Sequence, residues 1–209
     1  MLGIHDYGIF VASCVLLNLM PGQDTFYILG RSIGQGRPAG VASALGITAG
    51  SVVHTLAAAL GLSAVLATSA TAFLVLKFAG AAYLIYLGIR TMFARSLPPP
   101  LEDHAGSADT WEAFRQGLVT NVLNPKVALF FLALLPQFIA PESPTKVAAF
   151  VALGLTFVTT GTVWCLVLAI AAARVRGFFL RQPRVLSRLS RFTGALFVYL
   201  GVRLAATEP

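Results

Sequence analysis

The stretch NLMPGQDTF, residues 18–26, interrupts an apolar run with the pair Pro21 and Gly22 and then places an acid, Asp24. A proline inside a helix removes one backbone hydrogen bond and clashes with the preceding turn, so the helix bends or splits there. The freed backbone groups cannot be satisfied by lipid and need partners in protein or water. The stretch therefore predicts a broken helix whose break carries a carboxylate.

The composition indicates that this helix lies in a membrane. Of the 209 residues 57% are hydrophobic and 11% are charged, and the mean hydropathy is +0.80. We predict an all-α polytopic membrane protein, a single transmembrane domain over residues 1–209, built from spans near the roughly 20 residues that a bilayer requires. The six expected spans are residues 7–29, 39–66, 70–89, 115–139, 147–171 and 190–206. The first is interpreted as a retained helix, because no basic residue precedes it and no small-residue cleavage pattern follows it.

The basic residues are concentrated in alternate connections between these spans. They are Arg31 and Arg37; Arg90, Arg95 and Arg115; and Arg174, Arg176, Arg181, Arg184, Arg188 and Arg191. Because positively charged loops stay on the cytoplasmic side, we expect both termini to be extracytoplasmic. The net charge of +7 then reflects topology and contact with anionic lipid. These loops lack the interleaved aromatic residues of a nucleic-acid site, so no nucleic-acid partner is predicted.

A proline-rich acidic segment, SLPPPLEDHAGSAD at residues 96–109, divides the chain into halves. Residues 1–95 form the first expected three-helix repeat, residues 96–114 a cytoplasmic linker and residues 115–209 the second repeat. Three spans per half turn the second half upside down relative to the first. This 3+3 inverted repeat is typical of secondary transporters, in which broken helices form the binding site near the middle of the membrane.

The fourth expected span contains a counterpart of the opening stretch, NVLNPK at residues 121–126. Pro21 lies ten residues before Arg31, and Pro125 lies ten residues after Arg115. The two breaks are therefore expected at matching depths. Asn124 followed by Pro125 is typical of a helix N-cap with proline in the first turn. Such a restarted half-helix would direct its positive dipole end towards the centre of the membrane.

Two charged residues accompany the breaks, Asp24 in the first span and Lys126 in the fourth. A charge at the centre of a membrane helix costs about 2.5–3.5 kcal/mol on insertion scales, so such residues usually line a cavity or an ion path. The alternative is that Asp24 only caps a helix and that Lys126 snorkels or pairs with it. Asn18, Asn121 and Asn124 would line the same space, or they would join helices to one another by hydrogen bonds.

The second span carries Gly46, Gly50 and His54 on one helical face. The glycines favour close approach of a neighbouring helix, and they leave a homodimer open. His54 would relay protons or serve as a hydrogen-bonded packing residue. The fifth span contains threonines that would line a polar path or bond only to their own helix. They are Thr156, Thr159, Thr160 and Thr162.

Four stretches together resemble the LysE/RhtB family of amino-acid exporters. They are PGQD at residues 21–24, GRPAGVASALGITAGSVVH at 36–54, LKFAGAAYLIYLGIR at 76–90 and GLVTNVLNPKVALFFLALLPQF at 117–138. The resemblance covers about the first two-thirds of the chain. It implies a six-helix bacterial inner-membrane protein that exports amino acids or their derivatives by using the proton gradient. The family commonly reads Pro-Gly-Pro-Asn where this chain has Pro21-Gly22-Gln23-Asp24, so the substrate and coupling ion are open at this point.

Together these features predict an amino-acid site between the broken first and fourth helices. Lys126 and the N-terminus at Asn124–Pro125 would attract the carboxylate, and Asp24 would receive the ammonium group or a proton. Neither a metal site nor a cofactor is predicted. One rival is a cation or metal-ion exporter using Asp24 and amide oxygens, which the fixed charge of Lys126 disfavours. A second is a membrane thiol relay through Cys14 and Cys165. A third is a purely structural bundle, which would leave two charges and two prolines in the membrane without a role.

Overall fold

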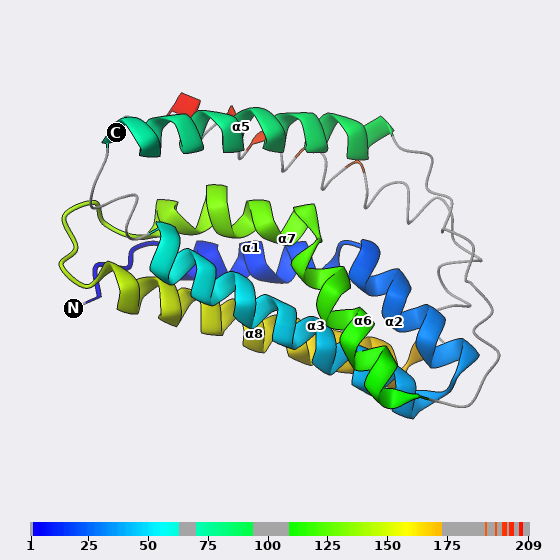
Figure 1. Cartoon of the computed structure of the whole chain (residues 1–209). Helices are drawn as coiled ribbons and strands as arrows, with labels where there is room; N and C mark the ends of the chain where they lie inside the picture. The colour runs from blue at the N-terminus through cyan, green and yellow to red at the C-terminus, as the bar shows by residue number, and fades with distance from the viewer. Residues whose placement is uncertain are drawn as a thin grey trace.

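The computed structural model describes residues 2–62, 70–93 and 109–172 and scattered positions between 191 and 206. These residues are almost entirely helical, as expected (Figure 1). The α-helices are α1 (Tyr7–Leu19), α2 (Gln23–Gly34), α3 (Arg37–Ala57), α5 (Ala70–Phe93), α6 (Thr110–Val122), α7 (Pro125–Leu129) and α8 (Lys146–Ile170). Two π-helical turns, η1 (Ala58–Leu62) and η2 (Phe130–Leu134), and a 3₁₀ turn, η3 (Leu135–Phe138), complete the described elements.

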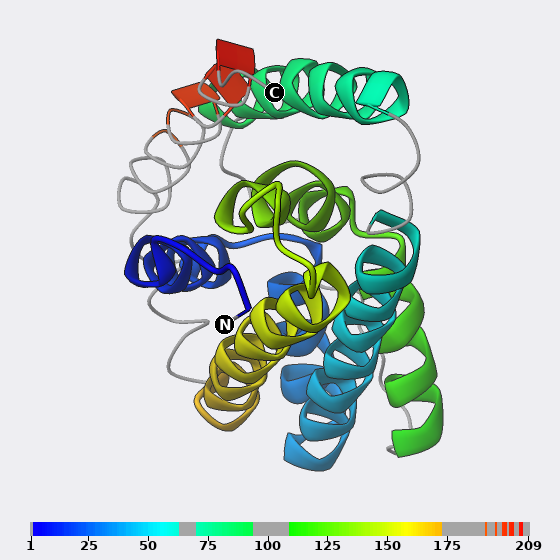
Figure 2. The same cartoon turned by 90° about the vertical axis from the view of Figure 1, so that its left-hand side faces the viewer.

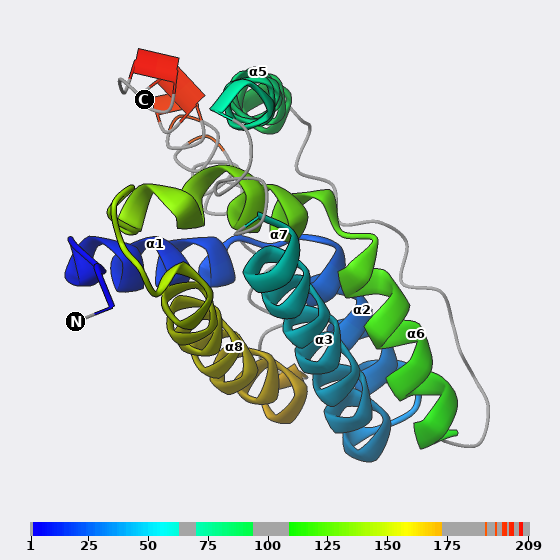
Figure 3. The same ribbon diagram turned by 60° about the vertical axis from the view of Figure 1, so that its left-hand side comes forward.

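The first and fourth spans are both broken where the sequence predicts. Helices α1 and α2 meet at an angle of 49° across Met20, Pro21 and Gly22. Helix α6 and the segment from α7 to η3 meet at 46° across Leu123 and Asn124. Each bend falls next to a proline, which cannot donate the backbone bond that would continue the preceding helix. Figure 3 shows the second bend clearly, where the green chain turns from α6 into α7.

Among the described residues, two helices are long and apolar enough to cross a membrane, and up to four spans result if each bent pair counts as one. The two are Arg37–Gly61 and Lys146–Ile170, which match the second and fifth predicted spans. The predicted 70–89 span lies within helix α5. Residues 63–69 and most of the predicted 190–206 span lie outside the described residues.

Three helices extend beyond the predicted spans. Helix α2 continues to Gly34, past residue 29, and α5 continues to Phe93, past residue 89. Helix α6 starts at Thr110, inside the predicted linker and before residue 115. The reason is Asp109, whose Oδ1 accepts hydrogen bonds of 3.0 Å from the backbone N–H groups of Trp111 and Glu112. An aspartate N-cap of this kind favours the start of a helix, here directly after the proline-rich connector.

The glycine face of the second span packs against α6. A Cβ atom on Gly46 would overlap the carbonyl oxygen of Phe114, and one on Gly50 would lie 2.7 Å from Cβ of Asn121. Gly117 of α6 approaches the Ser43 carbonyl just as closely from the other side. The prediction of close packing is therefore confirmed. Because α6 of the same chain occupies this face, the glycine stripe is not the surface on which a second copy would dock.

The described core consists of two apolar clusters. The larger lies around α1, η2, η3 and the first half of α8 and contains the aromatic residues Phe10, Phe130, Phe131, Phe138 and Phe157. The smaller joins α2, α3 and the second half of α8. It contains Ile28, Ala44, Ile47, Cys165, Leu168 and Ala169. Residues from both clusters border the level at which the two spans break, so polar groups at that level lie between two apolar layers.

The two ends of the bundle are closed differently. At one end, the end of α2 and the starts of α3 and α6 lie near one another at the lower right of Figure 1, and Arg31 of α2 donates a hydrogen bond to Gln116 of α6. At the other, the N-terminal stretch pairs with the segment after η3 (Figure 2): Ile4 and Ile139 form an isolated antiparallel bridge. The Ser143 hydroxyl also donates to the Leu2 carbonyl over 3.0 Å. Both broken spans thus contact each other on either side of their bends.

Candidate substrate site between the broken spans

A cavity of about 30 Å³ with both polar and apolar side chains in its wall lies where the two breaks face each other. Helices α1, α2, α3, α6, α7 and α8 all contribute to its wall. Its polar lining comprises Asn18, Asp24, Thr25, Thr48, Ser51, Asn121, Lys126 and Thr162, with Trp164 and Cys165 beside them. A volume of this size takes a water molecule or two. An amino acid would need a larger cavity than the one in this structure.

Asp24 lies in the first turn of α2 but does not cap it. The N-cap residue is Gly22, and no side chain accepts a capping bond there. Instead, Oδ2 of Asp24 accepts a hydrogen bond of 2.9 Å from Nδ2 of Asn121 on α6. Its other oxygen, Oδ1, is buried without a hydrogen-bond partner among the described residues. The interpretation of Asp24 as a mere helix cap is thus wrong, and half of its carboxylate is available to a ligand.

Lys126 reaches back across the first break. Its Nζ donates to the carbonyl oxygens of Leu17 and Met20, each over 3.1 Å. These are acceptors that the break between α1 and α2 leaves without helical partners. In the described part of the chain Lys126 and Asp24 do not form an ion pair, whereas His5 and Asp6 lie 3.3 Å apart. A Cβ atom on Gly22 would lie 3.3 Å from Nζ, so a glycine at this position leaves room for the ammonium group.

Asn124 caps the restarted helix as the sequence predicts. Its Oδ1 accepts a hydrogen bond of 3.0 Å from the backbone N–H of Lys126, and Pro125 occupies the first turn. Helix α7 keeps α-helical geometry for only five residues before the π-helical turn η2 begins. Asn124 is buried, and its Nδ2 has no partner among the described residues. Asn124 and Pro125 hold Lys126 in position, but neither belongs to the cavity wall.

Asn121 connects the remaining polar residues. Its Oδ1 accepts a hydrogen bond of 3.3 Å from Ser51, while its Nδ2 binds Asp24. His54 approaches the Asn121 carbonyl with Nε2 at 3.1 Å and stacks on Phe131 at a centroid distance of 5.7 Å. His54 is not part of the cavity wall. It contacts the site through the backbone of Asn121, and its role as a proton relay stays a prediction.

The threonines of α8 bond to their own helix, and some of them also contact polar side chains of other helices. Each of the four donates to a carbonyl of its own helix. Thr162 also pairs with Thr48 of α3 over 2.9 Å beside the cavity. The Asn18 amide donates to Thr160 over 3.4 Å, and the Tyr7 hydroxyl meets Thr156 at 3.0 Å. Thr159 is exposed and makes only its own-helix bond among the contacts described.

The two cysteines do not form a relay. Cys14 lies in the larger apolar cluster and Cys165 in the smaller one, and both are free thiols. Each is buried as a small apolar side chain would be. The geometry thus gives no support to disulfide exchange between them.

Comparison with known proteins agrees with this architecture. The family model described as "LysE type translocator" matches residues 15–208. The chain belongs to the LysE type translocator family. A homoserine/homoserine lactone efflux protein of Salmonella typhimurium is 32% identical over 199 residues, which cover 95% of each chain. An uncharacterized membrane protein of Pseudomonas aeruginosa is 32% identical over 208 residues, or 98% of this chain and 96% of that one. No solved structure matches the chain.

Membership of this translocator family makes the chain a transmembrane transporter rather than an enzyme. Sequence reasoning missed several residues of its cavity: Thr25, Thr48, Ser51 and Trp164. Thr48 and Ser51 lie beside Gly46 and Gly50, and the tight contact of those glycines with α6 carries them to the break. Tryptophan in membrane proteins is enriched at the lipid–water interfaces. The position of Trp164 well inside the predicted 147–171 span is therefore the sequence feature that could indicate a role in the cavity.

Proposed function

We propose that this translocator is a secondary active exporter of amino acids or their derivatives in the bacterial inner membrane, driven by proton antiport. The observation that carries the proposal is the half-satisfied carboxylate of Asp24 opposite Lys126 in one cavity between two broken spans. An α-amino acid carries an ammonium group and a carboxylate on one carbon. A cavity with one acid and one base matches that pair of charges.

Asp24 supplies a way to couple export to protons. Its Oδ1 can accept either a substrate ammonium group or a proton, and it has no protein partner among the described residues to displace first. Competition between these two ligands makes one leave as the other binds. A carboxylate bound in turn by cargo and proton gives antiport when only the occupied forms change their direction of access.

The rest of the proposed arrangement follows the sequence. Six spans in a 3+3 inverted repeat would rock about the two breaks, with both termini extracytoplasmic. The contacts at the two ends of the bundle are the ones such a motion would open alternately. At one end they join Arg31 of α2 to Gln116 of α6, and at the other Ile4 to Ile139.

The homoserine and homoserine lactone named in the Salmonella relative motivate the first substrates to test. Both are small and carry an amino group on the α-carbon, which is bonded to the C1 carbonyl carbon. A cavity of about 30 Å³ with one acid and one base in its wall would have to enlarge to admit any amino acid, and least for a small one.

A cation or metal-ion exporter is the second candidate, and it is less well supported. Asp24 is the single acid in the described cavity wall, and Lys126 lies in the same wall. In the described residues no group of three His, Cys, Asp or Glu side chains is placed to hold a metal ion. A divalent cation would therefore face one carboxylate and one fixed positive charge, which is a weak arrangement for a hard cation.

The proposal is tested by transport in proteoliposomes. Purified protein is reconstituted, and counterflow of radiolabelled L-homoserine and a panel of other amino acids is measured with and without an imposed pH gradient. We expect wild-type protein to accumulate at least one of them in response to the gradient. Failure to move any amino acid in either assay would overturn the exporter function.

Asp24→Asn tests the role proposed for this carboxylate in binding the substrate and the proton. It keeps the size of the side chain but removes the charge, so gradient-driven accumulation should fall to the level of empty liposomes. Glu142→Gln, an exposed carboxylate outside the helices, is the matched control and should transport normally. Undiminished proton-driven transport by Asp24→Asn would sink the role proposed for that residue.

A further inference from the structure

Trp164 lines the cavity but has no role in the proposed function. Its indole Nε1 is buried and has no hydrogen-bond partner among the described residues. A buried donor without a partner destabilises the protein by the full free energy of its desolvation. Tryptophan N–H groups therefore usually have an acceptor when they are buried. Five side chains in the described chain carry buried polar atoms without a partner, and two of these side chains line the cavity, Asp24 and Trp164.

These two orphaned atoms are of opposite kinds. Oδ1 of Asp24 on α2 only accepts hydrogen bonds while it is ionised, and Nε1 of Trp164 on α8 only donates. The two side chains reach the cavity from different helices. A ligand that satisfies both must offer a donor at one end and an acceptor at the other. An amino acid does so with its ammonium group and its C1 oxygen.

Lys126 does not fill the same role. Its ammonium group already donates to two backbone carbonyls, and its charge favours a carboxylate over an uncharged carbonyl. The indole is a neutral donor with a fixed direction, so it can bind the C1 oxygen of a free acid or of an uncharged derivative. A site that hydrogen-bonds a substrate group strongly rejects analogues that lack it.

Resting on the proposed function, we infer that Trp164 is a specificity-determining residue that donates its indole N–H to the C1 oxygen of the substrate. The amino group of the same molecule occupies Oδ1 of Asp24. The ligand class is therefore small α-amino acids and their C1 carbonyl derivatives. Simple amines are excluded because they leave the indole unpaired.

The chain allows a direct optical test, because Trp111 is its one other tryptophan. Trp111 is 66% exposed on α6 and stacks on Phe114, away from the cavity wall. Trp111→Phe therefore leaves Trp164 as the sole indole fluorophore in otherwise native surroundings. We expect L-homoserine to change its emission in a saturable manner. In Trp164→Phe, which retains Trp111, the same titration should leave the emission unchanged.

The decisive comparison uses L-homoserine and 3-aminopropan-1-ol, the same molecule without its carboxylate. In wild-type protein, L-homoserine should bind well and the amine weakly. Trp164→Phe keeps an aromatic ring but removes the donor, so L-homoserine should bind about tenfold more weakly, the size of one lost hydrogen bond. Binding of the amine should change by less than about twofold, because it never used the indole.

The outcomes separate this inference from the proposed function. If wild-type protein binds and transports L-homoserine, but Trp164→Phe weakens neither probe or weakens both equally, the inference is wrong and the exporter function stands. An unresponsive Trp164 in Trp111→Phe at saturating L-homoserine would also overturn it. If wild-type protein neither binds nor transports any amino acid, the exporter function fails, and the inference fails with it.

Discussion

The side-chain amide of Asn121 donates to Oδ2 of Asp24 over 2.9 Å, which joins the fourth span to the first at the level where both are broken. The reverse connection also exists, because Lys126 of the fourth span donates to the Leu17 and Met20 carbonyls of the first. Each break therefore supplies the partners that the other lacks. The two breaks form one polar unit, and a displacement of one span changes the hydrogen bonds of both.

Replacing Asn121 by leucine should separate this unit while keeping the approximate volume of the side chain. Asp24 would then have no donor on either oxygen, and Ser51 would lose its acceptor. We expect the initial rate of amino-acid counterflow to fall by at least about tenfold, since one lost charged hydrogen bond is worth about 1.5–3 kcal/mol. Gln137→Leu is the matched control, because Gln137 bonds only a carbonyl of its own span. A wild-type rate in Asn121→Leu would contradict this account.

Replacing Lys126 by methionine should affect both binding and folding. The substitution removes the charge opposite Asp24 and leaves the carbonyls of Leu17 and Met20 without their donor. We expect KM for L-homoserine to rise at least about tenfold and the stability in detergent to fall by about 1–3 kcal/mol, the cost of buried unsatisfied groups. Lys146→Met, at the start of α8, serves as the control and should change neither quantity appreciably. An unaltered KM would show that the ammonium group is only structural.

Gly46→Ala tests the packing that brings α6 to the site. The added methyl group would overlap the Phe114 carbonyl, so α3 and α6 would have to move apart. Overpacking of this kind typically costs about 1–3 kcal/mol. We expect a lower thermal unfolding midpoint in detergent and reduced transport. Gly8→Ala is the control, because nothing lies within 4 Å of the corresponding position on α1; equal midpoints for the two variants would contradict the close contact.

The sequence predicted the breaks because their cause is local. Pro21 and Pro125 disrupt a backbone bond wherever they stand in a helix, and Asn124 caps the next turn through its own neighbour, Lys126. The N-cap at Asp109 is equally local, but the proline-rich composition around it conceals this signal. Helix α6 therefore begins five residues before the predicted fourth span.

The partners of the charged residues could not be predicted in the same way. Pairing of Asp24 with Lys126 is one of the alternatives that two opposite charges at one depth leave open. In the structure the Lys126 ammonium group bonds instead to carbonyls freed by the bend of α1. Which acceptors a bend frees, and which side chains reach them, depends on helix directions that no local pattern encodes. The positions of Trp164 and Thr48 in the cavity wall also depend on these helix directions.

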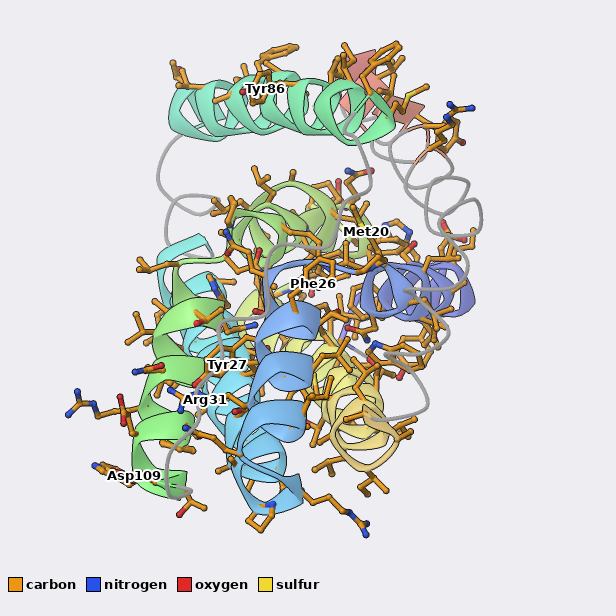
Figure 4. All side chains as sticks on the ribbon, turned by 90° about the vertical axis from the view of Figure 1, so that its right-hand side faces the viewer. Met20, Phe26, Tyr27, Arg31, Tyr86 and Asp109 are labelled. Carbon is orange, nitrogen blue, oxygen red and sulfur yellow. The ribbon has the colours of Figure 1, made fainter. Side chains whose placement is uncertain are left out.

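The end of α2 provides a test of how the two broken spans are held together. Arg31 is only 3% exposed, and its guanidinium donates to the side-chain oxygens of Gln35 and Gln116 while lying 5.6 Å from the Tyr27 ring centroid. Figure 4 shows Arg31 and Tyr27 together on α2 beside α6. The planar fork allows one cation to bond both glutamines at once, which a lysine ammonium group on a different stem cannot reproduce.

We therefore expect Arg31→Lys to be more harmful than its conservative chemistry suggests. It keeps a buried positive charge but loses at least one of its two acceptors, and the tie between α2 and α6 loosens. The stability in detergent should fall by about 1–3 kcal/mol, whereas Arg115→Lys, exposed on α6, should stay within about 0.5 kcal/mol of the wild type. Arg31→Leu removes the charge together with its desolvation cost, so it should be no worse than the lysine variant. If Arg31→Lys unfolds at the wild-type midpoint, the guanidinium does not hold α2 to α6.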